Sequence, residues 1–436
     1  MRFVLYKLGV TFLTLAASAV AWAAPPQFSE QRRIGLTIGD QWEPSVAADA
    51  SGHIYVLYPQ YGSVPGCRDC QIPTMLLLVS NDNGKTWQPP HVMWAAGSGQ
   101  FDAQVVIDPS DHRTLFAAWL QNGKRDVVVA RSFDAGVSWS FAVAVRGNVQ
   151  LDKPALAVRG QNVYVAFNHE EEVWAASSQN GGRTFTWTRV NPESRPGWSL
   201  LGSATVDPSG SLYLGWASYP KAGGANSSVE VYVSKSADTG KTWTHKLLDV
   251  SSVSPDCKDE DCGEGYLGAQ IALTSDSDGT LYALWNAGQI PAAPQQIYFS
   301  SSTNGGENWL PRAAVSSADA EHAFPAITAG SHGDVRIAWM RTSPNETSDP
   351  DSSDSHKAVY WNTFYRSSSN GGATWSEETR VSAFVAGYSY IANEGFRFPF
   401  GDYFGMAIDN HGDTHIVWGE GLNYQSPGSI WYASGR

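Results

Sequence analysis

The sequence predicts an all-β fold, a seven-bladed β-propeller, from two repeated patterns that run out of phase along the chain. The first is a turn, spelled SNDNGKTW from Ser80 to Trp87, and it occurs six times. The second is an apolar strand, a turn and another strand that ends in an aromatic residue, and it occurs seven times. Repeats of roughly 50 to 80 residues that hold four short strands are typical of propeller blades.

The N-terminal residues 1–23 are predicted to be a secretory signal peptide. Arg2 and Lys7 precede an apolar run, and the small residues Ala21 and Ala23 provide a cleavage site. A membrane anchor is the alternative, but the apolar run is shorter than the ~20 residues that span a bilayer. We therefore expect a secreted or periplasmic protein without a membrane span, in which residues 24–436 form a single propeller.

The two ends of the chain predict how the ring closes. The C-terminal SIWYASGR supplies a third strand for the seventh blade and stops before a fourth, whereas Arg32 to Ile38 has no partner ahead of the first blade. We expect this N-terminal strand to complete the seventh blade, because closure removes exposed sheet edges.

The first pattern favours a tight turn between the two outer strands of a blade. An Asp or Asn accepts hydrogen bonds from backbone amides of the turn, a glycine takes positive φ, and an aromatic residue packs beneath. The six copies begin at Ser80, Ser132, Ser178, Ser236, Ser302 and Ser368. The second pattern predicts the two inner strands, and its seven copies begin at Pro44, Ala103, Pro154, Gly202, Ala269, Pro325 and Phe404.

The composition excludes a nucleic-acid role and favours a soluble protein with an aromatic-rich surface. The formal net charge is -13, and the chain contains 18 tryptophans. Its four cysteines form two close pairs, Cys67 with Cys70 and Cys257 with Cys262, which predict two local disulfides in an exported protein. A four-thiolate zinc site is the alternative, but it requires pairs on different sides of the ring to converge.

The repeated turn resembles the Asp box, or bacterial neuraminidase repeat, of the sialidase-like superfamily, and the resemblance covers nearly the whole mature chain. In that superfamily Asp boxes are structural and lie on the face away from the active site, so the resemblance implies architecture rather than activity. Sialidases bind a substrate carboxylate with three arginines and use an Asp as acid/base and a Tyr–Glu pair as nucleophile. This sequence departs from that pattern in two ways. Trp42 occupies the position of the first arginine, and we count seven blades, whereas these sialidases resemble six-bladed rings.

The connections on the face opposite the repeated turns should surround the mouth of the central channel. Carboxylates, imidazoles and aromatic rings there would suit sugar recognition, because rings stack on sugars and acids accept hydroxyl protons. The candidate substrate-binding residues are Trp42, Glu43, Asp102, Asp152, His169, Arg341 and Arg397. The alternative is that these residues only solvate the rim or pair with each other.

The connection from Gly387 to Gly405 holds the strongest candidates. We expect Arg397 to bind ligand oxygens bidentately, because the flanking phenylalanines shield it from water. Asp402 and Glu420 are the predicted general acid and base, because close carboxylates push each other's pKa apart. Tyr403 is the third catalytic candidate. The alternative is a structural ion pair between Arg397 and Asp402.

The leading hypothesis is a monomeric, secreted, sialidase-like carbohydrate-active protein, a glycoside hydrolase acting on a carbohydrate or glycoconjugate at the channel mouth. The rival hypothesis is a non-catalytic propeller that binds glycans or a protein partner. We expect no cofactor and no catalytic metal. Two acidic loops, PDCKDEDCGEGY and SPNETSDPDSSDSHK, could hold structural calcium through clustered carboxylates.

Overall fold

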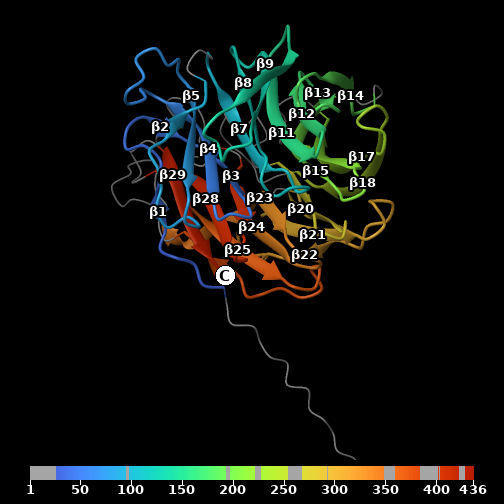
Figure 1. The fold of residues 1–436 in the computed structure, drawn as a ribbon. Coiled ribbons are helices and arrows are strands. Elements are labelled where there is room, and N and C mark those ends of the chain that lie inside the picture. The colour runs from blue at the N-terminus through green and yellow to red at the C-terminus, as the bar shows by residue number, and fades with distance from the viewer. Residues whose placement is uncertain are drawn as a thin grey trace, which may run out of the picture.

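The computed structural model describes residues 26–94, 98–192, 197–220, 227–253, 268–291, 293–347, 359–382, 401, 403–421 and 428–436. All regular structure within these residues is β-strand, and the strands form seven separate sheets. The sheets follow one another around a ring in chain order (Figure 1). The predicted seven-bladed propeller is confirmed. No helix in the described ranges could cross a membrane.

Each blade is an antiparallel sheet whose strands run outward from the channel in chain order. Blade 1 consists of β2 (Asp40–Gln41), β3 (Ser45–Ala48), β4 (Ile54–Tyr61), β5 (Thr74–Ser80) and β6 (His91–Val92). Blade 2 consists of β7 (Phe101–Ile107), β8 (Leu115–Gln121), β9 (Asp126–Ser132) and β10 (Ser140–Arg146). Blade 3 consists of β11 (Leu151–Arg159), β12 (Asn162–His169), β13 (Glu172–Ser178) and β14 (Thr186–Arg189).

The remaining blades repeat this order. Blade 4 consists of β15 (Trp198–Val206), β16 (Leu212–Tyr219), β17 (Val229–Ser236) and β18 (Thr244–Ser251). Blade 5 consists of β19 (Ile271–Ser275), β20 (Leu281–Ala287), β21 (Gln296–Ser302) and β22 (Ala313–Ala314). Blade 6 consists of β23 (His322–Ala329), β24 (Val335–Thr347), β25 (Val359–Ser368) and β26 (Thr379–Arg380).

Blade 7 joins the two ends of the chain. It consists of β27 (Gly405–Ile408), β28 (Thr414–Gly421), β29 (Gly428–Gly435) and the N-terminal β1 (Arg32–Arg33). Arg32 pairs with Tyr432, so the outermost strand comes from the opposite end of the chain, as predicted. The blue and red ends of the ribbon accordingly lie side by side in Figure 1. This pairing closes the ring and covers a sheet edge that would otherwise be open.

Each of the six repeated turns has the same pattern of hydrogen bonds. In each, the serine hydroxyl donates to the Asp or Asn side chain at 2.8–3.0 Å and accepts from the glycine amide at 2.8–3.0 Å. The Thr86 hydroxyl and amide bind Asp82 and lower its pKa to about 2. Gly84 has φ of 77°, which a residue with a Cβ rarely adopts. The turns are therefore structural elements of the fold.

The repeated turns and the inner hairpins lie on one face, as predicted. The amide of Asn83, in the first turn, donates to the Gly52 carbonyl of the neighbouring hairpin. The side chain of Asn83 also donates to Asp409 Oδ2 in blade 7, at 2.7 Å. The connections that bear the candidate residues consequently lie at the opposite end of the strands.

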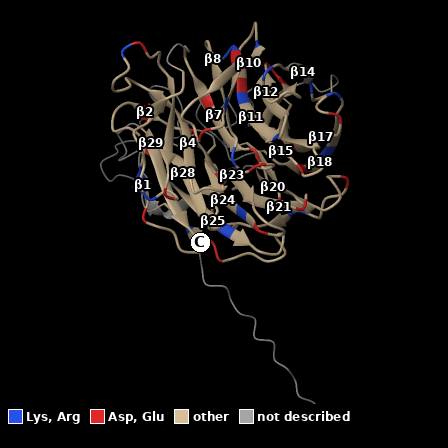
Figure 2. Cartoon of the chain, viewed as in Figure 1, with Lys and Arg blue, Asp and Glu red and all other residues tan. Residues whose placement is uncertain are grey.

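Seven buried apolar clusters lie between the blades, one at each interface. Five blades place a fully buried tryptophan on the second strand, at Trp119, Trp216, Trp285, Trp339 and Trp418. Charged residues lie mainly on the connections between strands (Figure 2). Burial of apolar area between twisted sheets therefore stabilises the ring.

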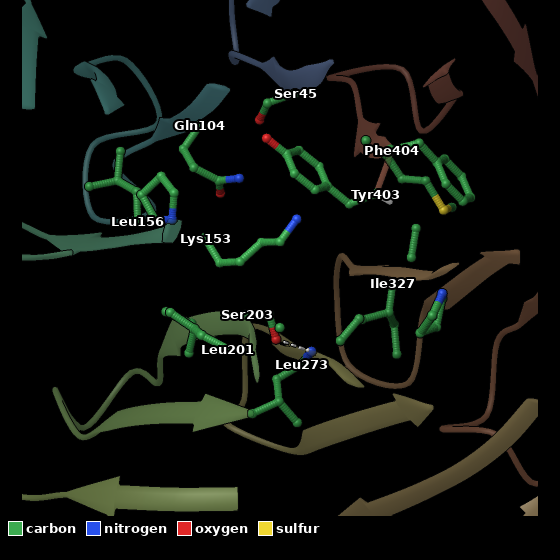
Figure 3. A pocket seen from close by; sticks show the side chains of 18 of the residues that line it. Ser45, Gln104, Lys153, Leu156, Leu201, Ser203, Leu273, Ile327, Tyr403 and Phe404 are labelled. Carbon is green, nitrogen blue, oxygen red and sulfur yellow. Dashed lines mark hydrogen bonds between the residues drawn. The ribbon is translucent and has the colours of Figure 1, made fainter. Parts of the chain in front are cut away.

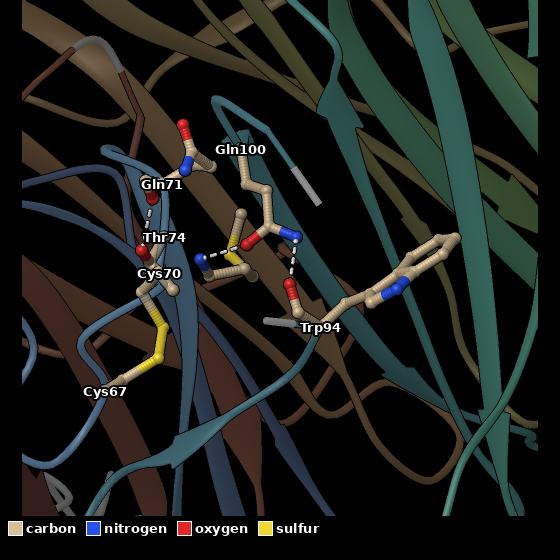
Figure 4. Close-up of a disulfide and its surroundings, with 7 residues drawn as sticks. Cys67, Cys70, Gln71, Thr74, Trp94 and Gln100 are labelled. Atoms are coloured by element: carbon tan, nitrogen blue, oxygen red, sulfur yellow. Dashed lines mark hydrogen bonds between the residues drawn. A yellow bond between two sulfur atoms is a disulfide. The ribbon is translucent and has the colours of Figure 1, made fainter. Parts of the chain in front are cut away.

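The Cys67–Cys70 disulfide is present, as predicted, in the connection between β4 and β5. Nearby, the Gln100 side chain accepts from the Met75 amide at 2.6 Å and donates to the Trp94 carbonyl (Figure 4). This glutamine joins blade 1 to the segment that leads into blade 2. The second predicted disulfide, Cys257–Cys262, lies outside the described residues.

Candidate functional site

The innermost strands are interrupted by β-bulges where they approach the channel mouth. Pairing shifts between Phe101 and Gln104 in blade 2, and between Asp152 and Ala155 in blade 3. The bulge residues Asp102 and Lys153 have φ of 56° and 48°, and Glu43 occupies the corresponding place in blade 1 with φ of 53°. Left-handed backbone costs a non-glycine residue roughly 1–3 kcal/mol and is concentrated at functional sites. Three adjacent blades thus present strained, charged residues at the mouth.

Lys124 connects two of these blades through an ion cluster. Its Nζ lies 2.9 Å from Asp152 Oδ1 and 3.5 Å from Asp102 Oδ2. It also lies 5.4 Å from the centroid of the Phe101 ring. Although burial would lower the pKa of Lys124, attraction by Asp102 and Asp152 raises it above its usual value. Lys124 is therefore a permanent cation between two carboxyl groups.

The β8–β9 hairpin fixes the position of Lys124. Asn122, Gly123 and Lys124 are three successive left-handed residues, and the Lys124 carbonyl accepts from the Leu151 amide at 2.7 Å. The sequence interpretation did not include Lys124. The Asn-Gly pair that precedes it is a strong hairpin signal and could have placed this lysine at the mouth.

Asp152 is the accessible member of the cluster. Its side chain is 41% exposed, whereas Asp102 is buried. Partial burial would raise the pKa of Asp152, but attraction by Lys124 and Lys153 and the hydrogen bond from Lys124 hold it below its usual value. Asp152 is therefore ionised near neutral pH.

A row of aromatic rings borders the cluster on the side of blade 1. The rings of Trp42 and Tyr61 lie 4.4 Å apart, and Tyr61 lies 6.2 Å from Phe101. Burial, followed by the negative charges of Glu43 and Asp102, raises the pKa of Tyr61 well above its usual value. Tyr61 therefore stays protonated and can donate a hydrogen bond. The sequence interpretation included Trp42 and did not include Tyr61.

A cavity of about 240 Å³ lies between the innermost strands. Lys153 and Tyr403 line it from blades 3 and 7, and their side chains point toward the same space (Figure 3). The Nζ of Lys153 lies 5.5 Å from the centroid of the Tyr403 ring. Deeper in the cavity, Ser203 Oγ accepts from the Leu273 amide at 2.7 Å and joins two blades. Lys153 and Tyr403 are thus brought together at the channel, and Asp152 directly precedes Lys153 in β11.

Other candidate residues lie elsewhere in the described structure. Glu420 is buried within blade 7, where its Oε2 accepts from Trp418 Nε1 at 2.7 Å, and burial raises the pKa of Glu420 well above its usual value. Arg341 forms ion pairs with Glu378 and Asp319. His169 lies against two tryptophans in blade 3. Arg397 and Asp402 lie outside the described residues.

A pair of titratable groups, the half-buried Glu321 and the buried His322, lies at the mouth end of blade 6. The Gln295 amide donates to Glu321 Oε2 at 2.9 Å, and the Gln295 carbonyl accepts from His322 Nδ1 at 2.9 Å. Burial raises the pKa of Glu321 to about 8 and lowers the pKa of His322 to about 4. Both side chains are therefore neutral near pH 7.

Within the described ranges, Asp409, His411 and Asp413 lie close enough together to hold a metal ion. The Asp409 carboxylate already accepts from the His411 and Asp413 amides and from Asn83, as a turn-forming aspartate does. This group lies on the face away from the mouth. The two acidic loops, for which calcium binding and simple solvation were the alternatives, fall almost entirely outside the described residues.

Comparison with known proteins shows similarity of fold. No protein-family model and no curated protein matches the chain. A polysaccharide lyase of family PL25, an ulvan lyase solved with bound -[GlcA(1-4)Rha3S]-, has a TM-score of 0.51 and 11% identity, covering 92% of this chain and 95% of the lyase.

Two further solved structures have TM-scores just below 0.5. A protein of unknown function from Dyadobacter fermentans DSM 18053 has a TM-score of 0.49 and 13% identity, covering 93% of this chain and 99% of that one. The NanB sialidase from Streptococcus pneumoniae has a TM-score of 0.48 and 12% identity, covering 72% and 67%. The predicted β-propeller is confirmed by the seven-bladed ring, and the comparisons concern the fold alone.

Proposed function

We propose that this protein binds a glycan at the channel mouth beside blades 1, 2, 3 and 7 and hydrolyses a glycosidic bond there. The observation that carries the proposal is Asp152, an exposed carboxylate held ionised by Lys124 and Lys153 and directly followed in the chain by the cavity-lining Lys153. A carboxylate in this state can accept a proton, as glycoside hydrolysis requires. The PL25 lyase of similar fold carries a bound sugar, which makes carbohydrate the first ligand to test.

In the proposed reaction Asp152 removes a proton from a water molecule whose oxygen bonds to the anomeric carbon. The bond from that carbon to the leaving oxygen breaks, and the leaving oxygen takes a proton from an acid across the mouth. Tyr403 and its neighbour Asp402 are the candidate acids. One water is consumed, and base and acid on opposite sides of the sugar correspond to inversion of configuration. The partly exposed rings of Tyr61 and Phe101 would stack on the sugar.

We also propose that the protein acts outside the cytoplasm. The Cys67–Cys70 disulfide supports this location, because such bonds persist mainly in oxidising compartments.

The experiment is a hydrolysis screen over chromogenic glycosides and soluble polysaccharides, together with a glycan-binding array. Asp152→Asn should reduce turnover at least about 100-fold while the fold, checked by thermal unfolding, is retained. Asp319→Asn, an exposed aspartate in blade 6, is the matched control and should retain full turnover. Glycan binding without hydrolysis by the unmodified protein would favour the rival, a glycan-binding propeller. Equal turnover by Asp152→Asn and the unmodified protein would contradict the catalytic assignment.

A further inference from the structure

We infer that a second sugar-binding surface, formed by His169, Trp174 and Trp187, lies on the flank of blade 3, extending from the mouth end of β12 outward to β14, and that the substrate is accordingly a polymeric glycan. The inference rests on the proposed function and extends it from a single sugar to a chain. The rings of Trp174 and Trp187 lie 5.0 Å apart, and His169 lies 5.8 Å and 6.1 Å from them. Trp187 is 41% exposed, so its ring is available to a ligand.

The three rings belong to one face of the blade. Strand pairing places His169 opposite Glu172, Trp174 opposite Arg189, and Ala176 opposite Trp187. Residues two apart in a strand point to the same side of a sheet. The rings therefore form one continuous patch across three strands, and aromatic faces of this kind stack on the apolar faces of sugar rings.

Polar contacts hold the patch in a fixed arrangement. Glu172 Oε2 accepts from Trp174 Nε1 at 2.9 Å, and Glu172 Oε1 lies 3.0 Å from Arg189 Nη1. One carboxylate therefore fixes both an indole ring and a guanidinium group at the edge of the patch. Binding to a fixed surface costs less conformational entropy than binding to a mobile one. The same polar groups are suited to hydrogen bonding with sugar hydroxyls.

Comparison among the blades shows that the propeller does not require tryptophan at these positions. The residues two positions after the aromatic of each repeated turn are Pro89, Phe141, Trp187, His245, Pro311 and Glu377. The residues four positions before the serine of each turn are Leu76, Val128, Trp174, Tyr232, Tyr298 and Phe364. Blade 3 has tryptophan at both positions, whereas the other five blades form the same sheet without one at either position.

The patch and the candidate carboxylate lie in the same blade, on neighbouring strands. Leu151, which precedes Asp152, pairs with His169, so the patch begins one strand outward from the reactive carboxylate. The outermost strand, which carries Trp187, lies roughly 15 Å from the innermost one, at about 4.8 Å per strand. A ligand that contacts both Asp152 and Trp187 must therefore be several sugar rings long.

The test compares long and short substrates in Trp187→Ala. The probes are xylan, laminarin, alginate and hyaluronan, each with its own short oligosaccharides, and binding is followed by tryptophan fluorescence and affinity electrophoresis. We expect Trp187→Ala to weaken binding or raise KM for the recognised polysaccharide about tenfold and to leave short oligosaccharides unchanged. Trp187→Phe should retain part of the affinity, because a smaller ring remains.

Phe141→Ala provides the matched control. Phe141 occupies the same position in blade 2, is 38% exposed, and also packs on a ring of its own blade, at 6.1 Å from Trp119. A loss of affinity in Trp187→Ala alone would support the inference. Equal losses in the two variants, or no loss in either, would overturn it. Binding of polysaccharide by Asp152→Asn separates the proposals, because the patch should still bind when hydrolysis at the mouth is absent.

Discussion

Lys124 Nζ in blade 2 lies 2.9 Å from Asp152 Oδ1 in blade 3, so the candidate site is built across an interface between blades. The same ammonium group lies 3.5 Å from the buried Asp102. The ionisation of Asp152 therefore depends on a residue from the neighbouring blade, and this dependence can be measured.

Lys124→Met should raise the pKa of Asp152, because the variant loses the largest attraction that keeps this carboxylate ionised. The acid limb of the pH–activity profile should consequently move to higher pH. Unfolding should become easier by about 1–3 kcal/mol, because two carboxyl groups lose their partner. The checks are the pH–rate profile and urea unfolding, with the exposed Lys241→Met as control. An unchanged acid limb would show that Lys124 has no role at the site.

Glu321 should make the protein less stable as the pH rises. Its folded pKa of about 8 exceeds the ordinary value of 4.5, so its contribution to stability is complete below pH 4.5 and is lost as the pH rises through 8. His322, with a folded pKa of about 4 against an ordinary 6.5, has the opposite sign and loses its contribution as the pH falls through 4. Between about pH 6.5 and 8, the change in stability from these two groups should therefore come mainly from Glu321.

The measurement is the free energy of unfolding at pH 6.5 and pH 8.5 for the unmodified protein and for Glu321→Gln. The decrease in stability across this range should be smaller in Glu321→Gln. The exposed Glu377→Gln should behave like the unmodified protein. Identical decreases in all three proteins would rule out a raised pKa at Glu321.

Gly84→Ala should test the closure between blades 1 and 7. A Cβ at Gly84 would lie 1.9 Å from the hydroxyl of the buried Tyr432, and φ is already 77°. Tyr432 cannot move freely, because it hydrogen-bonds His415 at 2.7 Å and packs on Trp87. We expect a loss of about 2–4 kcal/mol in unfolding free energy.

Gly210→Ala separates this steric conflict from backbone strain. Gly210 has φ of 88° but no atom within 4 Å of an added Cβ, so only the cost of left-handed backbone remains, about 1–2 kcal/mol. A loss at Gly84 no larger than that at Gly210 would show that the contact with Tyr432 does not determine closure.

Replacing Cys67 and Cys70 with serine should lower stability by no more than about 2 kcal/mol, because a disulfide that spans three positions constrains the unfolded chain little. Urea unfolding with and without a reducing agent measures the difference, and the double variant should not respond to the reductant. A much larger loss, or failure to fold, would contradict this account. Non-reducing peptide mapping in the same samples tests the predicted Cys257–Cys262 bond.

The repeats predicted most of the fold because each blade uses the same local chemistry. The serine, Asp or Asn, and glycine of every turn have fixed hydrogen-bond roles, so six turns could be recognised from short segments such as SNDNGKTW. The closing strand was also predictable, because Arg32 had no partner earlier in the chain. The turn pattern depends only on neighbours in sequence, whereas the closing strand was predicted from the number of strands that each end of the chain supplies.

The candidate site was only partly predictable, because it depends on contacts between blades. Glu43, Asp102 and Asp152 were identified from their places before the innermost strands, whereas Lys124 was missed because its partner Asp152 lies 28 positions later. The bulges that carry Asp102 and Lys153 extend the inner strands beyond their expected starts. Glu420 is buried beside Trp418, which donates a hydrogen bond to it. The position of Glu420 in its strand does not by itself predict this burial.

The central claim is that a sugar binds at the mouth beside Asp152, Lys153 and Tyr403, and the most direct measurement is a crystal structure of Asp152→Asn with an oligosaccharide from the recognised polysaccharide. We expect this structure to show a sugar ring within hydrogen-bond distance of residue 152, with Lys153 and Tyr403 on the other side of the ring. A sugar bound only on the face of the repeated turns, or a mouth left without sugar at saturating ligand, would contradict it.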